Sequence, residues 1–152
     1  MQVGLGTDVS GGFSPSILTA IQHASIASKV KCFNPTPHPP PSIHAVPFTD
    51  QQLSVVTLLY LATLGGAQLC CLDHQVGSFA PGKSFDALVV NVRDDSGNPA
   101  IWGSLGETDG LAENARNVLE GMLERFLFCG DDRNISRVYV KGRFIGGREY
   151  RQ

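Results

Sequence analysis

The sequence predicts a mixed α/β chain whose elements fall into two groups. A short apolar run at 3–7 leads through a glycine-containing turn into an amphipathic segment, which is the order of a strand, loop and helix unit. From residue 73 onward the pattern changes to extended segments that flank one long amphipathic stretch. Helices and strands are therefore both expected.

The composition is that of an ordinary globular protein. Of 152 residues, 42% are hydrophobic and 17% are charged, and the formal net charge is -2, so the chain does not belong to the disordered class. Acidic and basic residues are mixed along the chain, which leaves no basic face to bind a nucleic acid. The apolar stretch at 53–64 is shorter than the roughly 20 residues that span a bilayer. Neither a membrane span nor a signal peptide is expected.

The cysteine pattern favours free thiols. No C-x-x-C spacing occurs, and adjacent Cys70 and Cys71 cannot both enter one ordinary structural zinc site. Together with Cys32 and Cys129, they are expected to be reduced and mostly buried thiols of an intracellular protein.

The first group opens with a predicted strand at 3–7. A central strand normally has neighbours on both sides, and only two residues precede this one, so we expect the chain to be truncated. Ser14 is the expected N-cap and Pro15 the first residue of a helix at 15–30. The apolar side of this helix is formed by Ile17, Leu18, Ile21 and Ala24.

A proline-rich segment at 35–47 separates this helix from the next. Its six prolines remove backbone donors, so a surface loop is expected. The run Thr49-Asp50-Gln51-Gln52 has the form of a capping box and predicts a helix at 50–63. The Gly65-Gly66 pair should break it before a short helix that runs through Leu72. The buried stripe is expected at Leu53, Val56, Tyr60 and Leu64.

The second group combines a strand, a helix and a hairpin. A strand is predicted at 85–91, a turn-rich linker at 94–99 and a helix at 111–128, with Gly130 as its cap. The apolar side of that helix is formed by Val118, Leu119, Met122, Leu123 and Phe126. The last segment, 135–145, reads as a hairpin that turns at Lys141-Gly142.

Three stretches carry a family resemblance. They are VGLGTDVSGG at 3–12, LATLGGAQLCCLDHQVGSFAPGKSFDALVVN at 61–91 and FLFCGDDRNISRVYVKGRFI at 126–145. The middle one resembles the amidohydrolase superfamily, in which it links a barrel to a small β domain. The G-T-D-V-S-G-G and G-D-D-R-N-I runs are similar to guanine deaminases more than to other members. The segment at 35–47 departs from the shorter connection expected in that family.

The resemblance implies the fold of the C-terminal part of a metal-dependent (β/α)₈ barrel with part of a small flanking β domain. A complete barrel usually takes about 250 residues, so an incomplete barrel is expected. The implied divisions are residues 1–72 for the end of the barrel with strand eight and its helices, 73–93 for a strand segment of the β domain, 94–130 for a linker and helix, and 131–152 for the C-terminal hairpin.

The resemblance also implies an activity. Guanine deaminases are zinc-dependent hydrolases that convert guanine and water to xanthine and ammonia, and a homodimer in the cytoplasm is implied for the complete enzyme. Zinc provides the nucleophile by lowering the pKa of its water to about 7. In such proteins a His-x-His pair, two further histidines and an aspartate after the last strand hold the metal. Only the aspartate has a match here, so this chain alone is expected to be catalytically incomplete.

Asp8 is that matching position, and the resemblance implies that it approaches the zinc and shuttles a proton. The alternative is that Asp8 only caps a turn. Ser10, Gly11 and Gly12 follow at the expected mouth of the barrel, where they either let the backbone approach a planar purine or form a plain loop.

Other polar residues are expected to be structural. The four histidines show no ligand spacing, and none is predicted to bind a metal; they are His23, His38, His44 and His74. The cluster at 131–134 follows a helix end, where turn formation and surface pairing explain it.

Two further functions are consistent with the sequence. The chain could be a non-catalytic structural partner of a separate N-terminal half or of intact subunits. A different amidohydrolase, acting on another cyclic C–N substrate, would share the metal chemistry and differ in its pocket.

Overall fold

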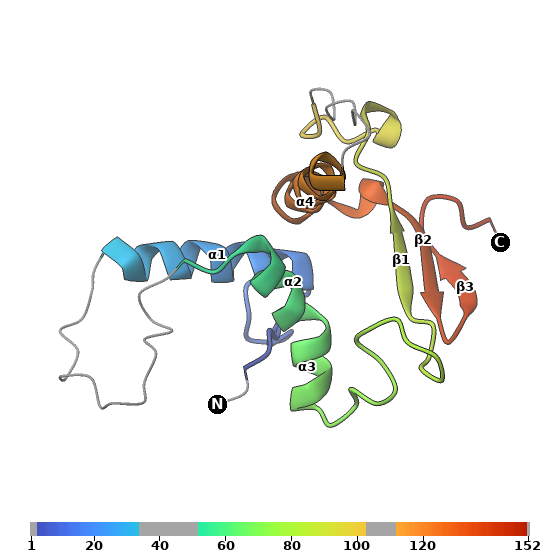
Figure 1. Cartoon of the computed structure of the whole chain (residues 1–152), viewed down its shortest axis with the longest axis horizontal. Coiled ribbons are helices and arrows are strands. Elements are labelled where there is room, and N and C mark those ends of the chain that lie inside the picture. The colour runs from blue at the N-terminus through green and yellow to red at the C-terminus, as the bar shows by residue number, and fades with distance from the viewer. Residues whose placement is uncertain (1–2, 34–51, 103–111, 152) are drawn as a thin grey trace.

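The computed structural model describes residues 3–33, 52–102 and 112–151. Three helices, α1 to α3, lie on one side, a three-stranded sheet lies on the other, and α4 packs against α1 and α2 (Figure 1). The described chain is thus mixed α/β, as the sequence predicts.

Helix α1 spans Ile17–Phe33, so it begins two residues later than predicted. The Ser16 carbonyl accepts from the Ala20 amide at 3.1 Å, while the Ser14 hydroxyl accepts only from the Ser16 amide at 3.2 Å. The prediction of Pro15 inside the helix is wrong, whereas the bond from the Ser16 amide to the Ser14 hydroxyl is of the kind that an N-cap side chain makes. Two serines can cap this turn, and the spacing of apolar residues alone does not choose between them.

Helix α2 spans Val55–Ala62 and is capped by Ser54, whose hydroxyl accepts from the Thr57 amide at 3.1 Å. The predicted capping box is wrong as a helix start, since Gln52 is outside the helix; its first three residues, 49–51, lie outside the described residues. The buried face of α2 also differs from the predicted stripe. Val55, Leu58 and Leu61 are buried, whereas Val56 and Tyr60 of the predicted stripe are 58% and 42% exposed.

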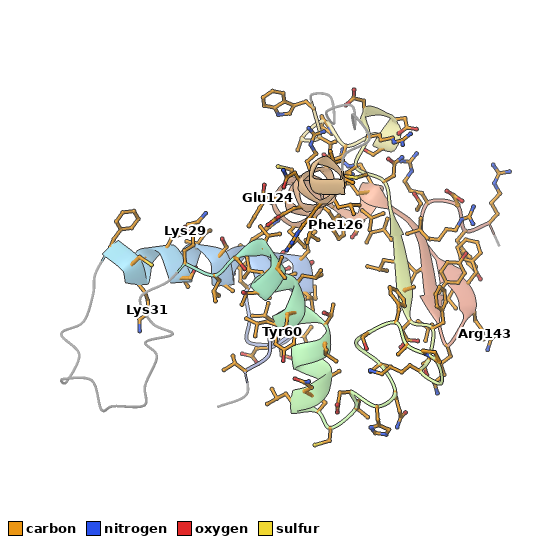
Figure 2. All side chains as sticks on the ribbon, viewed as in Figure 1. Lys29, Lys31, Tyr60, Glu124, Phe126 and Arg143 are labelled. Atoms are coloured by element: carbon orange, nitrogen blue, oxygen red, sulfur yellow. The ribbon has the colours of Figure 1, made fainter. Side chains whose placement is uncertain are left out.

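The predicted break at Gly65-Gly66 is also wrong, because both glycines belong to α3, Leu64–Leu69, and the chain bends two residues before Gly65, at Thr63. A Cβ on Gly65 would lie 3.0 Å from Cε1 of Tyr60. The missing side chain allows α3 to approach α2 closely. Tyr60 lies where the two helices meet (Figure 2), and its hydroxyl donates to Oε1 of Gln68 at 2.6 Å.

Helix α3 ends in a Schellman motif. The Leu72 amide donates to the Ala67 carbonyl at 2.8 Å and the Cys71 amide to the Gln68 carbonyl at 3.1 Å. Cys71 has φ 56°, the left-handed conformation that this position requires. Glycine is the usual residue there, because a side chain is disfavoured at positive φ.

The segment predicted as a strand at 3–7 is extended, but within the described parts of the chain no strand pairs with it. Its amide at Leu5 donates instead to the Leu61 carbonyl of α2 at 3.3 Å. An apolar run becomes a strand only when a second strand supplies the ladder. Here its apolar side chain at Leu5 packs against the helical core.

The sheet is antiparallel with the order β1-β2-β3. Its strands are Ala87–Val90, Ile135–Val140 and Arg143–Gly146. Lys141 and Gly142 have φ values of 49° and 75°, which is the type I′ turn that a two-residue hairpin favours. The predicted strand and hairpin are confirmed, although the first is shorter than expected. The predicted turn-rich linker contains a 3₁₀ turn, Asp94–Ser96.

Helix α4 spans Ala112–Cys129, as predicted to within one residue. Among its residues from 115 onward, Leu127 is the most buried, at 1% exposed, while Leu119 of the predicted apolar side is 66% exposed. The helix ends where the Gly130 amide donates to the Phe126 carbonyl at 3.0 Å. Phe126 lies on the side of α4 that faces α1 and α2 (Figure 2).

A buried asparagine joins the sheet to the linker. Asn134, at 0% exposed, accepts through Oδ1 from Nδ2 of Asn98 at 2.7 Å and from the Asp131 amide at 3.0 Å. Its Nδ2 donates to the Asn91 carbonyl at 2.7 Å. Asn98 also donates to the Cys129 carbonyl at 2.9 Å, which ties the end of α4 to the same group.

The cysteines are free, as predicted, but the expectation that they are mostly buried is wrong, because all four are exposed. They lie at or near the ends of helices, and the core is filled from the middle of α1 and α2 and from α4. Among the described residues, no helix is long and apolar enough to cross a membrane.

Much apolar surface is uncovered, and from this we predict that the isolated chain self-associates. Among the described residues, large apolar side chains that are exposed outnumber the apolar side chains that are buried. The most exposed of them, at 74% or more, are Phe13, Phe33, Phe79 and Trp102. Apolar patches of this kind favour association. Light scattering should find oligomers; a monodisperse monomer that binds no apolar-surface dye would contradict this.

We predict that Asn134→Ala loosens the sheet. The substitution removes the side-chain partner of the Asp131 backbone amide and of the Asn91 carbonyl, and one of the two acceptors of the Asn98 side-chain amide, which should destabilise the sheet by about 2–4 kcal/mol. Hydrogen exchange of the β2 amides measures this loss even if the chain associates. The control Asp132→Ala, at an exposed neighbouring position, should leave these rates unchanged. Equal protection of the β2 amides from hydrogen exchange in both variants would show that the Asn134 side chain does not stabilise the sheet.

Candidate active site

Asp8 stands where the extended segment turns toward α1. Its carbonyl accepts from the amides of Gly11 and Gly12 at 2.9 and 2.5 Å, which closes the turn. The residue has φ 48°, a left-handed conformation that Asp tolerates better than most residues. Its side chain is exposed, so the carboxylate is available to a group outside the turn.

The glycines of this turn are needed for its shape. A Cβ on Gly12 would lie 1.9 Å from the Thr7 carbonyl oxygen, and one on Gly11 would lie 2.9 Å from Oδ2 of Asp8. The first contact is impossible for any side chain, and the second would displace the carboxylate. The structure therefore brings Gly11 and Gly12 together with Asp8, while Ser10 is exposed at the tip of the same turn.

Beside this turn is a small cavity of about 160 Å³ between the segment 5–7 and the first turns of α1. Phe13 and His23 form one side of it, with ring centroids 5.1 Å apart and planes tilted by 58°. Sequence reasoning missed this pair. The signal was weak, because the contact depends on where α1 begins, and that start was predicted two residues too early.

A larger groove of about 850 Å³ also borders the extended segment and shares Leu5 and Gly6 with the small cavity. Its walls are mostly apolar and come from that segment, from α2 and α3 and from the loop at 76–79; they include Gly4, Leu59, Gly66, Leu69, Cys70 and Phe79. Asp8 is not among its lining residues.

Two of the four histidines lie within the described residues. His23 is on α1 and exposed, and His74 is exposed with Nε2 2.9 Å from Nε2 of Gln75. His38 and His44 lie outside the described residues.

The polar cluster at 131–134 is structural. Asp131 caps a 3₁₀ turn, Asp132–Asn134, by accepting from the Arg133 amide at 2.9 Å. The Arg133 guanidinium approaches the same carboxylate to 2.6 Å, and this hydrogen bond lowers the pKa of Asp131 from its ordinary value. Both side chains are about half exposed, so the pair adds little to stability.

The described residues do not include a complete set of metal ligands. Within residues 3–33, 52–102 and 112–151, no three His, Cys, Asp or Glu side chains lie close enough to hold a metal ion. The Asp8 carboxylate is exposed, and a carboxylate oxygen is one of the ligand types that zinc accepts. A catalytic zinc generally has three protein ligands and a water, so further ligands would have to come from elsewhere.

Comparison with known proteins assigns the family. The model of the amidohydrolase family matches residues 1–145, and the chain belongs to this family. Its similarity is to guanine deaminases within it. The guanine deaminase of Mus musculus is 37% identical over 146 residues, which is 95% of this chain and 28% of that protein. The probable guanine deaminase of Schizosaccharomyces pombe is 37% identical over 98% of this chain and 24% of its own length.

Solved structures agree. The guanine deaminase of C. acetobutylicum, with guanine bound in its active site, has a TM-score of 0.63 and 33% identity over 95% of this chain and 27% of that one. A guanine deaminase from Bradyrhizobium japonicum, at 21% identity and a TM-score of 0.69, shares the fold over 97% of this chain and 32% of that one. The chain thus spans about a quarter of the length of the curated relatives that it matches.

We predict that the isolated chain does not retain a metal ion with the affinity of a catalytic site. One exposed carboxylate cannot supply the three ligands that such a site uses. Zinc content after loading and dialysis should be far below one ion per chain, and it should be equal in the Asp8→Asn protein. One tightly held zinc that Asp8→Asn removes would contradict the prediction.

Proposed function

We propose that this chain forms the C-terminal part of a guanine deaminase, which hydrolyses guanine to xanthine and ammonia. The proposal rests on the match of 95% of the chain to guanine deaminases at 37% identity, and on the resemblance of the turn at 8–12 to theirs. The relatives are named for this activity, and the neighbour from C. acetobutylicum has guanine in its active site.

Asp8 is the residue that we propose for the chemistry. Its position directly after an apolar extended segment corresponds to the end of a barrel strand, where barrel enzymes place their catalytic groups. An exposed carboxylate held by a rigid backbone can accept a proton from one oxygen or nitrogen atom and return it to another. The turn that positions this carboxylate depends on Gly11 and Gly12, whose backbone amides both donate hydrogen bonds to the Asp8 carbonyl.

The metal of the proposed enzyme is zinc, and Asp8 would be the only ligand to it that we assign in this chain. Zinc would supply an activated water to the reaction. Its remaining ligands would come from histidines of the part of the fold that this chain does not cover. Ser10 is proposed, with the two glycines, to line the entry for a planar purine, because the three are exposed beside the carboxylate.

The other parts of the proposal follow from the same resemblance. Residues 1–72 would form the end of the barrel, 73–93 and 131–152 the shares of the small β domain, and 94–130 the linker and helix between them. A homodimer and a cytoplasmic location are proposed for the whole enzyme, and the four unpaired thiols support the second.

A chimaeric enzyme tests the proposal. Residues 1–152 replace the matching 28% of the mouse guanine deaminase, and ammonia release from guanine is measured. Turnover should be detectable, and Asp8→Asn should lower it by about 10² to 10⁴, the usual value of general acid–base help. The melting temperature should change little, because Asn also suits a turn in the left-handed conformation.

The matched control is Asp94→Asn, which changes an exposed carboxylate in the 3₁₀ turn Asp94–Ser96 and should leave turnover at the parent value. Turnover of the Asp8→Asn chimaera within a few-fold of its parent would leave Asp8 with a capping role only. A folded chimaera that loads zinc but releases no ammonia would contradict the assignment of the whole chain.

A further inference from the structure

Two neighbouring thiols stand at the end of α3. Cys70 is the C-cap of this helix, with φ −85° and ψ 1°, and Cys71 follows at φ 56°. Both residues are exposed and neither is in a disulfide. The pair is not used by the proposed active site, and Cys70 lies on the wall of the larger groove, which none of residues 8–12 lines.

The backbone at this pair is held in an uncommon state. Cys71 occupies the left-handed position of the Schellman motif, where a residue with a side chain is disfavoured. It stays there because the Leu72 and Cys71 amides are bonded to the last turn of α3. Both thiols therefore project from a short, solvent-exposed turn whose geometry the helix end imposes.

Other partners for these thiols are distant. Figure 1 shows the end of α3 well apart from the free end of α1, where Cys32 lies, and from α4, where Cys129 is the last residue. No group of three His, Cys, Asp or Glu within the described parts of the chain could share a metal with the pair. The thiol nearest to each of these two cysteines is therefore that of its neighbour in the sequence.

We propose that Cys70 and Cys71 form a reversible vicinal disulfide when the protein meets a hydroperoxide. One thiolate attacks the peroxide oxygen, which gives a sulfenic acid and releases one water from hydrogen peroxide. The neighbouring thiol then attacks the sulfenic sulfur, the S–S bond forms, and a second water leaves. Two thiols are oxidised by two electrons and one peroxide is reduced, so the step balances.

Adjacency explains both the speed and the reversibility of this bond. The second thiol is tethered next to the first, so its effective concentration is far above that of any thiol in solution. Adjacent Cα atoms are about 3.8 Å apart across a trans peptide, closer than in ordinary disulfides, so the bond is strained and readily reduced. Strained and exposed disulfides are the labile class.

The disulfide should change the end of α3 and the wall of the larger groove. Closing a small ring between Cys70 and Cys71 demands a different peptide geometry from the left-handed turn at Cys71. The hydrogen bond from the Leu72 amide to the Ala67 carbonyl should therefore open. Because Cys70 and Leu72 both line the groove, oxidation should change its wall.

The experiment uses the full chain, reduced and then exposed to a graded excess of hydrogen peroxide. Remaining thiols are alkylated, and cleavage on the amino side of Asp50 and Asp73 releases residues 50–72, which contain Cys70 and Cys71 and no other cysteine. After oxidation, this peptide should carry no alkyl group on either cysteine, and its mass should be two hydrogen atoms below that of the unalkylated dithiol peptide. Dithiothreitol should restore the dithiol.

Variants separate the pair from the other thiols. Cys70→Ser and Cys71→Ser should each abolish the lighter peptide, whereas Cys32→Ser and Cys129→Ser should keep it. Faster hydrogen exchange at Leu72 after oxidation is the structural readout. A peptide 50–72 in which both cysteines become sulfinic or sulfonic acids, or in which either is joined to Cys32, to Cys129 or to a second chain, would overturn the proposal.

Discussion

The apolar contact among α1, α2 and α4 is the constraint on which the rest of the structure depends. Ile21, Val55, Leu58 and Leu127 form its centre, and Leu5 packs against them from the extended segment. This single core connects residues separated by more than a hundred positions. A side-chain amide adds to it, since Gln22 donates to the Leu127 carbonyl at 3.1 Å. The position of Asp8, three residues after Leu5, therefore follows from helix packing rather than from strand pairing.

A second, polar centre holds the other half of the chain. Asn134 and Asn98 are buried and bonded to each other, and through the carbonyls of Asn91 and Cys129 they connect β1, the linker and the end of α4. Arg148 reaches the same region by donating to the carbonyls of Ser96 and Arg133. Because a buried amide without a partner is costly, these groups fix where the sheet stands relative to α4. The G-D-D-R-N-I run that is similar to guanine deaminases is thus mainly a structural device.

These two centres leave much apolar surface uncovered. The extended segment has no neighbouring strand among the described residues, and the groove beside it is largely apolar. A row of aromatic rings, with successive centroids 5.3–5.6 Å apart, is formed by Phe85, Tyr139, Phe144 and Tyr150, and all but Tyr139 are exposed. A chain that matches about a quarter of its relatives' length would have such surfaces where the rest of their fold packs. An enzyme site assembled from several strands of a barrel is shared between parts of the chain, which is why one carboxylate is all that the described residues contribute to the proposed chemistry.

The sequence by itself determined the order of the elements, the hairpin turn at Lys141-Gly142, the long helix α4 and Asp8 with its glycine turn. Each of these depends on local chemistry: a turn that needs positive φ, apolar spacing over many residues, or a short motif. Only the tertiary structure decided where α1 and α2 begin, which face of α2 is buried, that 3–7 packs on helices and that the cysteines are exposed. Alternative caps differ by about 1 kcal/mol or less, so the burial of Leu58 and its neighbours chooses between them. The contact of Phe13 with His23 depends in the same way on where α1 begins, which the spacing of apolar residues does not decide.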